Sequence, residues 1–267
     1  MKTVQELMRL DGRVALVTGG AGHLGGAICE ALAEIGASVM VSDQEAEACE
    51  AAVEGFRDAG LSNVACISAD LRDEQSTRDL VRRVLGEKGR LDILVHCAAF
   101  VGTTSFPGWV EPLEKQTVTA WDAALRVNLT SAFVLAQEAA PALSASGHGS
   151  VVLVSSIYGM VGPDLSLYEG TSMQNPAAYG ASKGGLLQLV RHLATALAPK
   201  VRVNALTPGG VWRNQPAAFR EKYEKRTPLA RMAVEEDLKG AAAFLASDLS
   251  AYVTGHNLVV DGGWTVW

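Results

Sequence analysis

Tyr179 and Lys183 are four residues apart in a segment that begins at Pro176, and Tyr179 alone among the five tyrosines has a lysine at that distance. If Pro176 opens a helix, the two side chains project from one face, one turn apart. An adjacent ammonium favours the ionised form of a phenol and brings proton transfer within reach at neutral pH. The pair predicts a general acid/base tyrosine, although the same spacing also occurs on ordinary helix surfaces.

A glycine-rich turn follows the first apolar run, residues 13–18. It contains Gly19, Gly22 and Gly25, and it leads into a helix-like stretch at 27–35 and a second apolar run at 37–43. Glycine permits positive φ and lets backbone N–H groups approach a pyrophosphate at the positive end of a helix dipole. The pattern predicts a βαβ unit that binds a dinucleotide, with a plain structural turn as the alternative.

Asp43 closes the second of these apolar runs. A carboxylate at the end of that strand accepts hydrogen bonds from the ribose hydroxyls of adenosine, and it repels a 2′-phosphate. The position of Asp43 therefore predicts NAD rather than NADP as the cofactor.

Strand-like and helix-like stretches alternate along the rest of the chain. Further strands are expected at 63–69, 91–97, 150–155, 200–206 and 257–260, and helices at 45–59, 73–88, 121–143, 176–198 and 234–246. This alternation predicts a doubly wound parallel α/β sheet of about seven strands, the Rossmann type, in a single domain spanning residues 1–267. The intervening segments 98–119, 157–175 and 211–232 are expected on the substrate side.

Composition narrows the class of protein. Of the 267 residues, 48% are hydrophobic and 19% charged, which is typical of a globular protein, and the net charge of −6 gives no reason to expect a nucleic acid partner. We expect no membrane span and no apolar leader, and therefore a cytoplasmic protein. The four cysteines form no C-x-x-C pair, so we expect neither a metal site nor a disulfide framework.

The order of motifs resembles the short-chain dehydrogenase/reductases. The resemblance runs from Val14 to Gly263 and rests on the glycine turn, Arg126-Val127-Asn128, Val154-Ser155-Ser156, Tyr179-Gly180-Ala181-Ser182-Lys183 and Val260-Asp261-Gly262-Gly263. It implies a catalytic tetrad of Asn128, Ser156, Tyr179 and Lys183. Lys183 would hold the nicotinamide ribose and lower the pKa of Tyr179, Ser156 would donate to the substrate oxygen, and Asn128 would anchor a proton-relay water.

The same resemblance implies a set of cofactor contacts and no metal. The contacts are Gly19, Gly22, His23, Leu24, Gly25, Asp43, Asp70, Leu71, Ala98, Tyr179, Lys183, Pro208, Gly209 and Val211. The family also implies a homotetramer or homodimer. From their place near residue 267, we expect Trp264 and Trp267 to pack on a neighbouring subunit.

The sequence departs from the family pattern at several positions. His23 replaces a glycine and lies either near the pyrophosphate or on an exposed turn. His96-Cys97-Ala98-Ala99 replaces the usual Asn-Asn-Ala-Gly, and Arg213 stands where a threonine commonly meets the nicotinamide carboxamide. The spacing from Ser156 to Tyr179 is longer than usual, and the insertion resembles a subgroup associated with bacterial surface-sugar pathways.

These features predict an NAD-dependent oxidoreductase that acts on a secondary alcohol or carbonyl, with Tyr179 as the acid/base. Polar residues of the insertion, facing Arg213 and Arg220, would suit a small polyhydroxylated or sugar-like substrate. Two alternatives remain: a non-catalytic NAD-binding regulatory protein, and a sugar epimerase or dehydratase that uses bound NAD.

Overall fold

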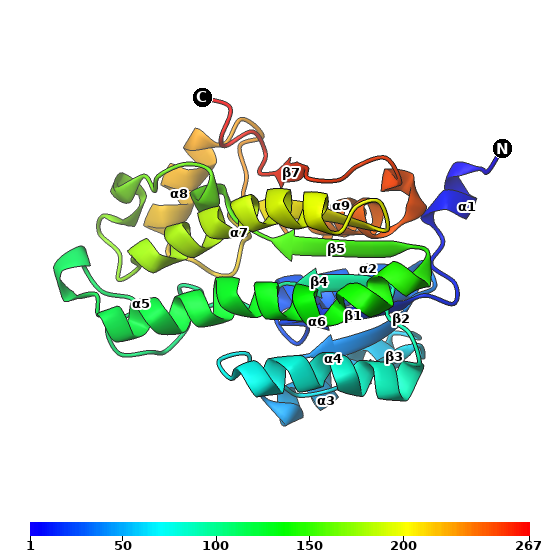
Figure 1. Ribbon diagram of the computed structural model, residues 1–267. Coiled ribbons are helices and arrows are strands. Elements are labelled where there is room, and N and C mark those ends of the chain that lie inside the picture. Colours follow the sequence, from blue (N-terminus) through cyan, green and yellow to red (C-terminus); the bar gives the residue numbers. More distant parts are fainter.

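Seven parallel strands form one sheet in the computed structural model, which describes residues 1–267 (Figure 1). The strand order is β3-β2-β1-β4-β5-β6-β7. The strands are β1 Val14–Thr18, β2 Ser38–Ser42, β3 Val64–Cys66, β4 Ile93–His96, β5 Gly149–Val154, β6 Val201–Pro208 and β7 Asn257–Val260. The predicted doubly wound α/β fold with about seven strands is confirmed.

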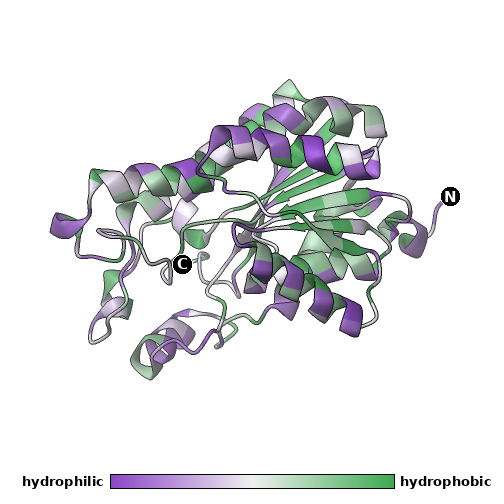
Figure 2. Cartoon of the chain, turned by 90° about the horizontal axis from the view of Figure 1, so that it is seen from below, coloured by the Kyte–Doolittle hydropathy of each residue, from purple (hydrophilic) through white to green (hydrophobic).

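Helices cover both faces of the sheet because the central strands are buried on both sides; every residue of β1, β4 and β5 is buried. On one face lie α2 (His23–Glu34), α3 (Ala46–Asp58) and α9 (Glu236–Ala246). On the other lie α4 (Glu74–Lys88), α6 (Ser131–Ser146) and α7 (Ala177–Ala196). Figure 2 shows the apolar strands between two layers of helices whose outer faces are more polar.

The helix expected at 121–143 is longer and contains a wider turn. It begins as α5 (Val118–Leu125), passes through a π-helical turn (Arg126–Thr130) and continues as α6. Asn128 lies in the middle of the π turn and is buried. Such turns break the regular ladder of helix hydrogen bonds and often occur at functional sites.

One expectation about local structure was wrong. The strand expected at 63–69 is only β3, although the N–H groups of Ile67 and Ala69 still donate to the carbonyls of Val41 and Asp43. The segment 211–232, for which no helix was predicted, contains α8 (Ala217–Arg226), which is largely polar.

The remaining elements are short. They are α1 (Val4–Met8) and the 3₁₀ turns at Leu113–Lys115, Ile157–Gly159, Leu165–Tyr168 and Asp248–Ser250. None of the helices combines the length and apolar character that crossing a bilayer requires.

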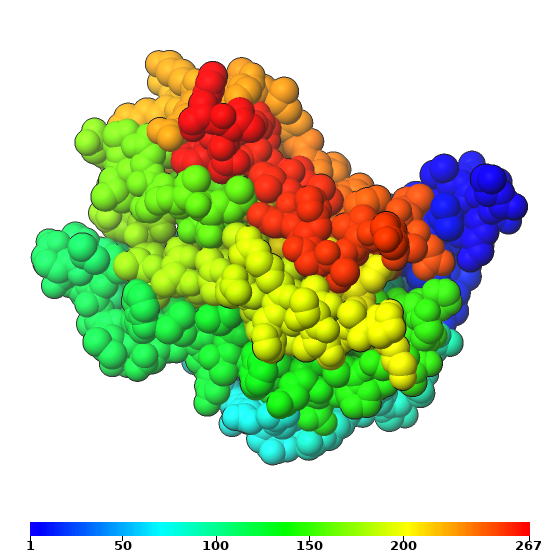
Figure 3. Space-filling model, turned by 45° about the horizontal axis from the view of Figure 1, so that its top comes forward, coloured from blue at the N-terminus to red at the C-terminus, as the bar shows by residue number.

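The two ends of the sheet differ in what surrounds them. The α5 region, the insertion after β5, α8 and the C-terminus gather at one end of the molecule, whereas α1 lies at the other (Figures 1 and 3). Parallel strands of an open α/β sheet place their ligand site beyond the carboxyl ends. The gathered segments are on that side, since β5 and β6 both lead into them.

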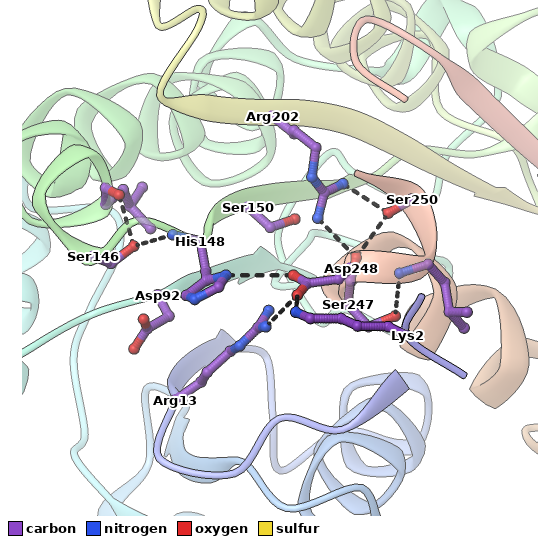
Figure 4. Close-up of polar contacts among 12 residues, drawn as sticks. Lys2, Arg13, Asp92, Ser146, His148, Ser150, Arg202, Ser247, Asp248 and Ser250 are labelled. Atoms are coloured by element: carbon purple, nitrogen blue, oxygen red, sulfur yellow. Dashed lines mark hydrogen bonds and ion pairs between the residues drawn. The ribbon is translucent and has the colours of Figure 1, made fainter. Parts of the chain in front are cut away.

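A polar network closes the amino ends of the strands (Figure 4). Asp248 lies 2.9 Å from Arg13, 3.4 Å from His148 and 3.7 Å from Lys2. Beside it, the guanidinium of Arg202 donates to the Ser250 hydroxyl and to backbone carbonyls. This end of the sheet is therefore filled by structural ion pairs.

Candidate active site

A cavity of about 660 Å³ lies at the carboxyl ends of the strands. Every residue of the predicted cofactor set lines this cavity, including Tyr179 and Lys183, which also belong to the predicted tetrad. Ser156 lines it as well. Asn128 alone among the predicted site residues does not line the cavity, although its neighbour Val127 does. The structure thus brings residues from the carboxyl ends of six strands, β1 to β6, into one site.

The glycine turn fits a pyrophosphate. Gly19 has φ +68°, and a Cβ there would lie 2.6 Å from the backbone nitrogen of Ala98. A Cβ at Gly25 would lie 2.0 Å from the carbonyl oxygen of Gly19. The turn can therefore be this tight only with glycine at both positions. Helix α2 begins here with Gly22 as its N-cap and no side-chain cap, so its first N–H groups are open to an anion.

His23 is the first residue of α2, and its side chain is exposed. Its Nδ1 lies 3.7 Å from Glu235, and the Nε of Arg213 lies 3.8 Å from the same carboxylate. The sequence left open whether His23 lies near the pyrophosphate or on an exposed turn. The structure places it at the rim of the cavity, exposed and beside Glu235.

Two carboxylates line the cavity beyond β2 and β3. Asp43 follows β2, and its Oδ1 accepts from the N–H of Gln44 at 2.9 Å. Asp70 is paired with Arg72 at 2.7 Å, and hydrogen bonds from Arg72 hold the pKa of Asp70 below its ordinary value. Asp43 is the carboxylate without an ion-pair partner, so it is available to ribose hydroxyls.

Close packing between the turn after β5 and α7 brings Ser156 to Tyr179. A Cβ at Gly159 would lie 2.7 Å from the Lys183 carbonyl, and the Ser155 hydroxyl donates to that carbonyl at 2.9 Å. Ser156 caps the 3₁₀ turn, and its Oγ accepts from the Tyr158 N–H at 3.2 Å. The Ser156 hydroxyl is therefore presented to the phenol of Tyr179.

Opposing effects act on the pKa of Tyr179. Burial raises the pKa of the phenol above its ordinary value, while contact with the Ser156 hydroxyl and the charge of Arg213 oppose the rise. Lys183 Nζ donates to the Val154 carbonyl at 2.8 Å and lies 5.8 Å from the Tyr179 ring centroid. A positive charge at this distance favours the phenolate.

Lys183 is itself buried, and desolvation lowers the pKa of its ammonium to about 8. A lysine with a pKa in this range still carries a proton through most of the neutral range. Its ammonium, which has three donors, uses one for Val154. The others remain for a ligand at this end of the cavity.

Asn128 connects three segments beneath the cavity. Its Oδ1 accepts from the Phe100 N–H at 2.7 Å, and its Nδ2 donates to the Ser182 hydroxyl at 2.9 Å. The side chain thus ties the π turn to the segment after β4 and to α7.

His96 is buried at the end of β4, directly beside the π turn. Its Nδ1 lies 2.9 Å from the Thr18 hydroxyl and its Nε2 lies 3.4 Å from the Ser131 hydroxyl. Burial, aided by the charge of Lys183, lowers the pKa of His96 to about 3. The imidazole is neutral at physiological pH and acts as a polar link between β1, β4 and α6.

An aromatic wall that sequence reasoning missed stands beyond Ser156. Tyr158, Tyr168, Phe219 and Tyr223 line the cavity and pack in one cluster with Trp264. Trp264 is 1% exposed and belongs to this cluster, so the expectation that it packs on a neighbouring subunit was wrong. The missed signal was the number of aromatic residues in the insertion and in 211–232.

The insertion was expected to turn its polar residues toward Arg213 and Arg220. Arg220 instead stacks on Trp212, 4.5 Å from the ring centroid, and pairs with Glu224 at 2.7 Å. Asp164 pairs with Arg226 on α8. The acidic side of the insertion thus fastens it to α8, and only Arg213 of the two arginines lines the cavity.

Comparison with known proteins agrees with this site. A family model described as enoyl-(acyl carrier protein) reductase matches residues 19–265. The chain is 36% identical over 258 residues to cis-4-hydroxycyclohexanecarboxylate dehydrogenase of Sinomonas cyclohexanicum, covering 95% of this chain and 96% of that protein. It is 31% identical over 263 residues to 2,5-dichloro-2,5-cyclohexadiene-1,4-diol dehydrogenase of Sphingobium indicum, covering 97% and 98%.

A solved structure shares the whole fold. Gluconate 5-dehydrogenase from Burkholderia cenocepacia J2315, in complex with NADP and tartrate, has a TM-score of 0.85 at 30% identity, covering 99% of this chain and 100% of that one. The chain belongs to the short-chain dehydrogenase/reductases. It is an oxidoreductase that acts on CH–OH groups.

Proposed function

We propose that the protein is an NAD-dependent dehydrogenase of cyclic secondary alcohols, with Tyr179 as the acid/base. The observation that carries the proposal is the cavity in which Ser156, Tyr179 and Lys183 meet beside an aromatic wall. The aromatic side chains of this wall favour a substrate with an apolar ring face. The wall offers only a few tyrosine hydroxyls as polar partners, which favours a substrate with few oxygen atoms. The names of the two relatives with cyclic substrates support the same choice.

The residues divide the chemistry among them. When bound, the nicotinamide supplies the hydride acceptor for oxidation or the donor for reduction. In oxidation, the phenolate of Tyr179 takes the hydroxyl proton, and the Ser156 hydroxyl orients the oxygen that loses it. Lys183 contributes positive charge and donors at the same end of the cavity, which favour the phenolate. The glycine turn and α2 bind the anionic part of the cofactor.

NAD is proposed as the cofactor because of Asp43. The Asp43 carboxylate has no cationic partner, so the 2′-phosphate of NADP, bound beside it, would meet an uncompensated negative charge. A sugar-like substrate is the second candidate; the gluconate relative favours it, since its substrate carries several hydroxyls. Initial rates with cyclohexanol and with free sugars, each with NAD⁺ and NADP⁺, separate these choices.

The expected result is oxidation of cyclohexanol with NAD⁺ at a higher kcat/KM than with NADP⁺, and a rate that increases with pH as the phenolate forms. If the protein oxidised sugars but not cyclohexanol, a sugar-like substrate would replace the cyclic alcohol in this proposal. Binding of NADH without turnover of any alcohol or sugar would instead indicate a cofactor-binding regulatory protein, and epimer formation without net oxidation would indicate an epimerase.

We also propose a homodimer or homotetramer. Val118 and Trp121 on α5 and Phe133 on α6 are apolar and exposed, so this side of the helix pair has apolar surface available for a second copy. Light scattering coupled to size-exclusion chromatography measures the mass in solution. A monomer at all concentrations would reject this proposal without affecting the enzymatic one.

A further inference from the structure

Two tyrosines of the aromatic wall and the neighbouring Asn175 form one hydrogen-bonded chain. The Nδ2 of Asn175 donates to the Tyr168 hydroxyl at 3.2 Å, and the Tyr168 hydroxyl donates to the Tyr158 hydroxyl at 3.0 Å. All three residues line the cavity. The chain begins in the segment just before α7 and ends two residues after Ser156.

The chain has a direction. A phenol carries one hydrogen, and Tyr168 uses its hydrogen on Tyr158 while it accepts from Asn175. Tyr158 accepts from Tyr168, so its own hydrogen remains as a donor, and no protein group in the structure accepts it. Hydrogen bonds in series strengthen one another, which makes this terminal donor a stronger one than an isolated phenol.

Both phenol rings are held in place by aromatic neighbours. The Tyr158 ring meets the Trp264 ring edge to face, with centroids 6.1 Å apart at 89°. The Tyr168 ring lies 5.4 Å from that of Phe219. A donor on such fixed rings is ready for a ligand atom without loss of side-chain freedom on binding.

The ring of Tyr158 packs against an apolar cluster that includes Ile157, Phe219 and Trp264, and its hydroxyl ends the polar chain from Asn175. A site built to hydrogen-bond an oxygen of the substrate discriminates against ligands that lack this oxygen. Tyr158 also follows the predicted catalytic serine by two residues, and its N–H donates to the Ser156 oxygen. The donor is therefore fixed relative to the reacting hydroxyl.

We infer that the Tyr158 hydroxyl is a specificity-determining donor that binds a second oxygen of the substrate, opposite the oxygen held by Ser156 and Tyr179. Tyr168 and Asn175 position and polarise it. The inference rests on the proposed oxidation of cyclic alcohols and adds that the preferred ring carries two oxygens, as in a cyclic diol or a hydroxyketone. The insertion between Ser156 and Tyr179 thus supplies the part of the site that selects the substrate.

The test compares cyclohexanol with each regioisomer of cyclohexanediol in the wild type and in Tyr158→Phe, with saturating NAD⁺. We expect the wild type to prefer at least one diol over cyclohexanol by about tenfold in kcat/KM, the effect of one well-placed hydrogen bond in an apolar site. Tyr158→Phe should abolish that preference, so that the ratio of kcat/KM for the diol to kcat/KM for cyclohexanol falls by about tenfold, to near one. Tyr168→Phe, which keeps the donor and removes its polarising partner, should give an intermediate loss.

Tyr252→Phe is the matched control, since Tyr252 is fully exposed and distant from the cavity. NADH affinity and thermal stability of each variant report any loss of structure. An equal loss for cyclohexanol and for every diol in Tyr158→Phe would mean a structural role and overturn the inference, as would a wild type without any diol preference. If the wild type oxidises no alcohol, the proposed function fails, and this inference fails with it.

Discussion

Lys183 Nζ lies 5.8 Å from the centroid of the Tyr179 ring, and both residues are on α7, one helical turn apart. The ammonium is fixed by the Val154 carbonyl at the end of β5, whereas the phenol faces the cavity beside Ser156. The sheet therefore fixes the position of the ammonium, and the helix fixes the position of the phenol. The lysine places a positive charge beside the cavity, and the phenol is open to the cavity.

The first prediction concerns Tyr179→Phe. Removal of the hydroxyl leaves no acid/base at this position, so kcat/KM for alcohol oxidation should fall by about 10²- to 10⁴-fold. The ring remains and fills the same space, so the affinity for NADH, measured by fluorescence titration, should change little. A variant that keeps most of the wild-type turnover would reject the role of Tyr179.

The second prediction concerns the cofactor. Asp43→Ser removes the carboxylate that repels a 2′-phosphate and keeps a small polar side chain, so the ratio of kcat/KM with NADP⁺ to that with NAD⁺ should rise by at least about tenfold. Glu45→Gln is the control, because Glu45 is an exposed acid two residues further along that does not line the cavity. Equal ratios in the wild type and Asp43→Ser would show that Asp43 does not choose the cofactor.

The glycine turn and Asp43 could be predicted from the sequence because each is indicated by residues that are close together along the chain. The turn around Gly19 and Gly25 needs residues without a Cβ, and Asp43 must follow the next strand, so both positions follow from a single βαβ unit. The fold class could be predicted for the same reason, because each strand and helix is indicated by the pattern of residues within it.

The substrate half depends on contacts between distant segments, which no local pattern encodes. Tyr158, Phe219 and Trp264 come from the insertion, α8 and the C-terminus, and they meet only in three dimensions. The prediction for Arg220 was wrong for a different reason, because its partners Trp212 and Glu224 lie along its own segment rather than across the cavity. The catalytic and cofactor roles of the residues that line the cavity stay predictions until the variants are measured.

The third prediction concerns His96, which replaces the family's usual asparagine. The pKa of His96 is lowered to about 3 in the folded protein, whereas an unfolded histidine has a pKa near 6.5. Between these values the unfolded chain binds a proton that the folded chain does not, so stability rises with pH and falls on acidification. The cost approaches about 1.4 kcal/mol for each pH unit below 6.5.

His96→Asn should remove this dependence while it keeps a neutral polar group beside Thr18. Urea unfolding of both proteins between about pH 7 and pH 5 measures the difference, and His192→Asn, on the exposed face of α7, is the control. If wild type and His96→Asn lose stability in parallel, the buried imidazole is not the source of the acid sensitivity.

The last prediction concerns Asp248, at the opposite end of the sheet (Figure 4). Burial acts to raise the pKa of Asp248, but Arg13, His148 and Lys2 together outweigh it and hold the pKa below its ordinary value of 3.8. Asp248→Asn leaves the buried guanidinium of Arg13 without its counter-charge, which should cost about 3 kcal/mol of unfolding free energy at neutral pH. Asp58→Asn, at an exposed position with no ion pair, should change it by less than about 0.5 kcal/mol.

The effect should disappear on acidification. Because the folded pKa of Asp248 is depressed, its contribution is present above the unfolded value near 4 and is lost as the pH falls through the lower folded pKa. The stability difference between the wild type and Asp248→Asn should therefore shrink below about pH 4 and vanish only below the folded pKa of Asp248, whereas their kcat/KM values at neutral pH should agree, since the network lies at the opposite end of the sheet from the cavity. A constant stability difference at all pH values would mean that packing or hydrogen bonding, rather than charge, makes Asp248 stabilising.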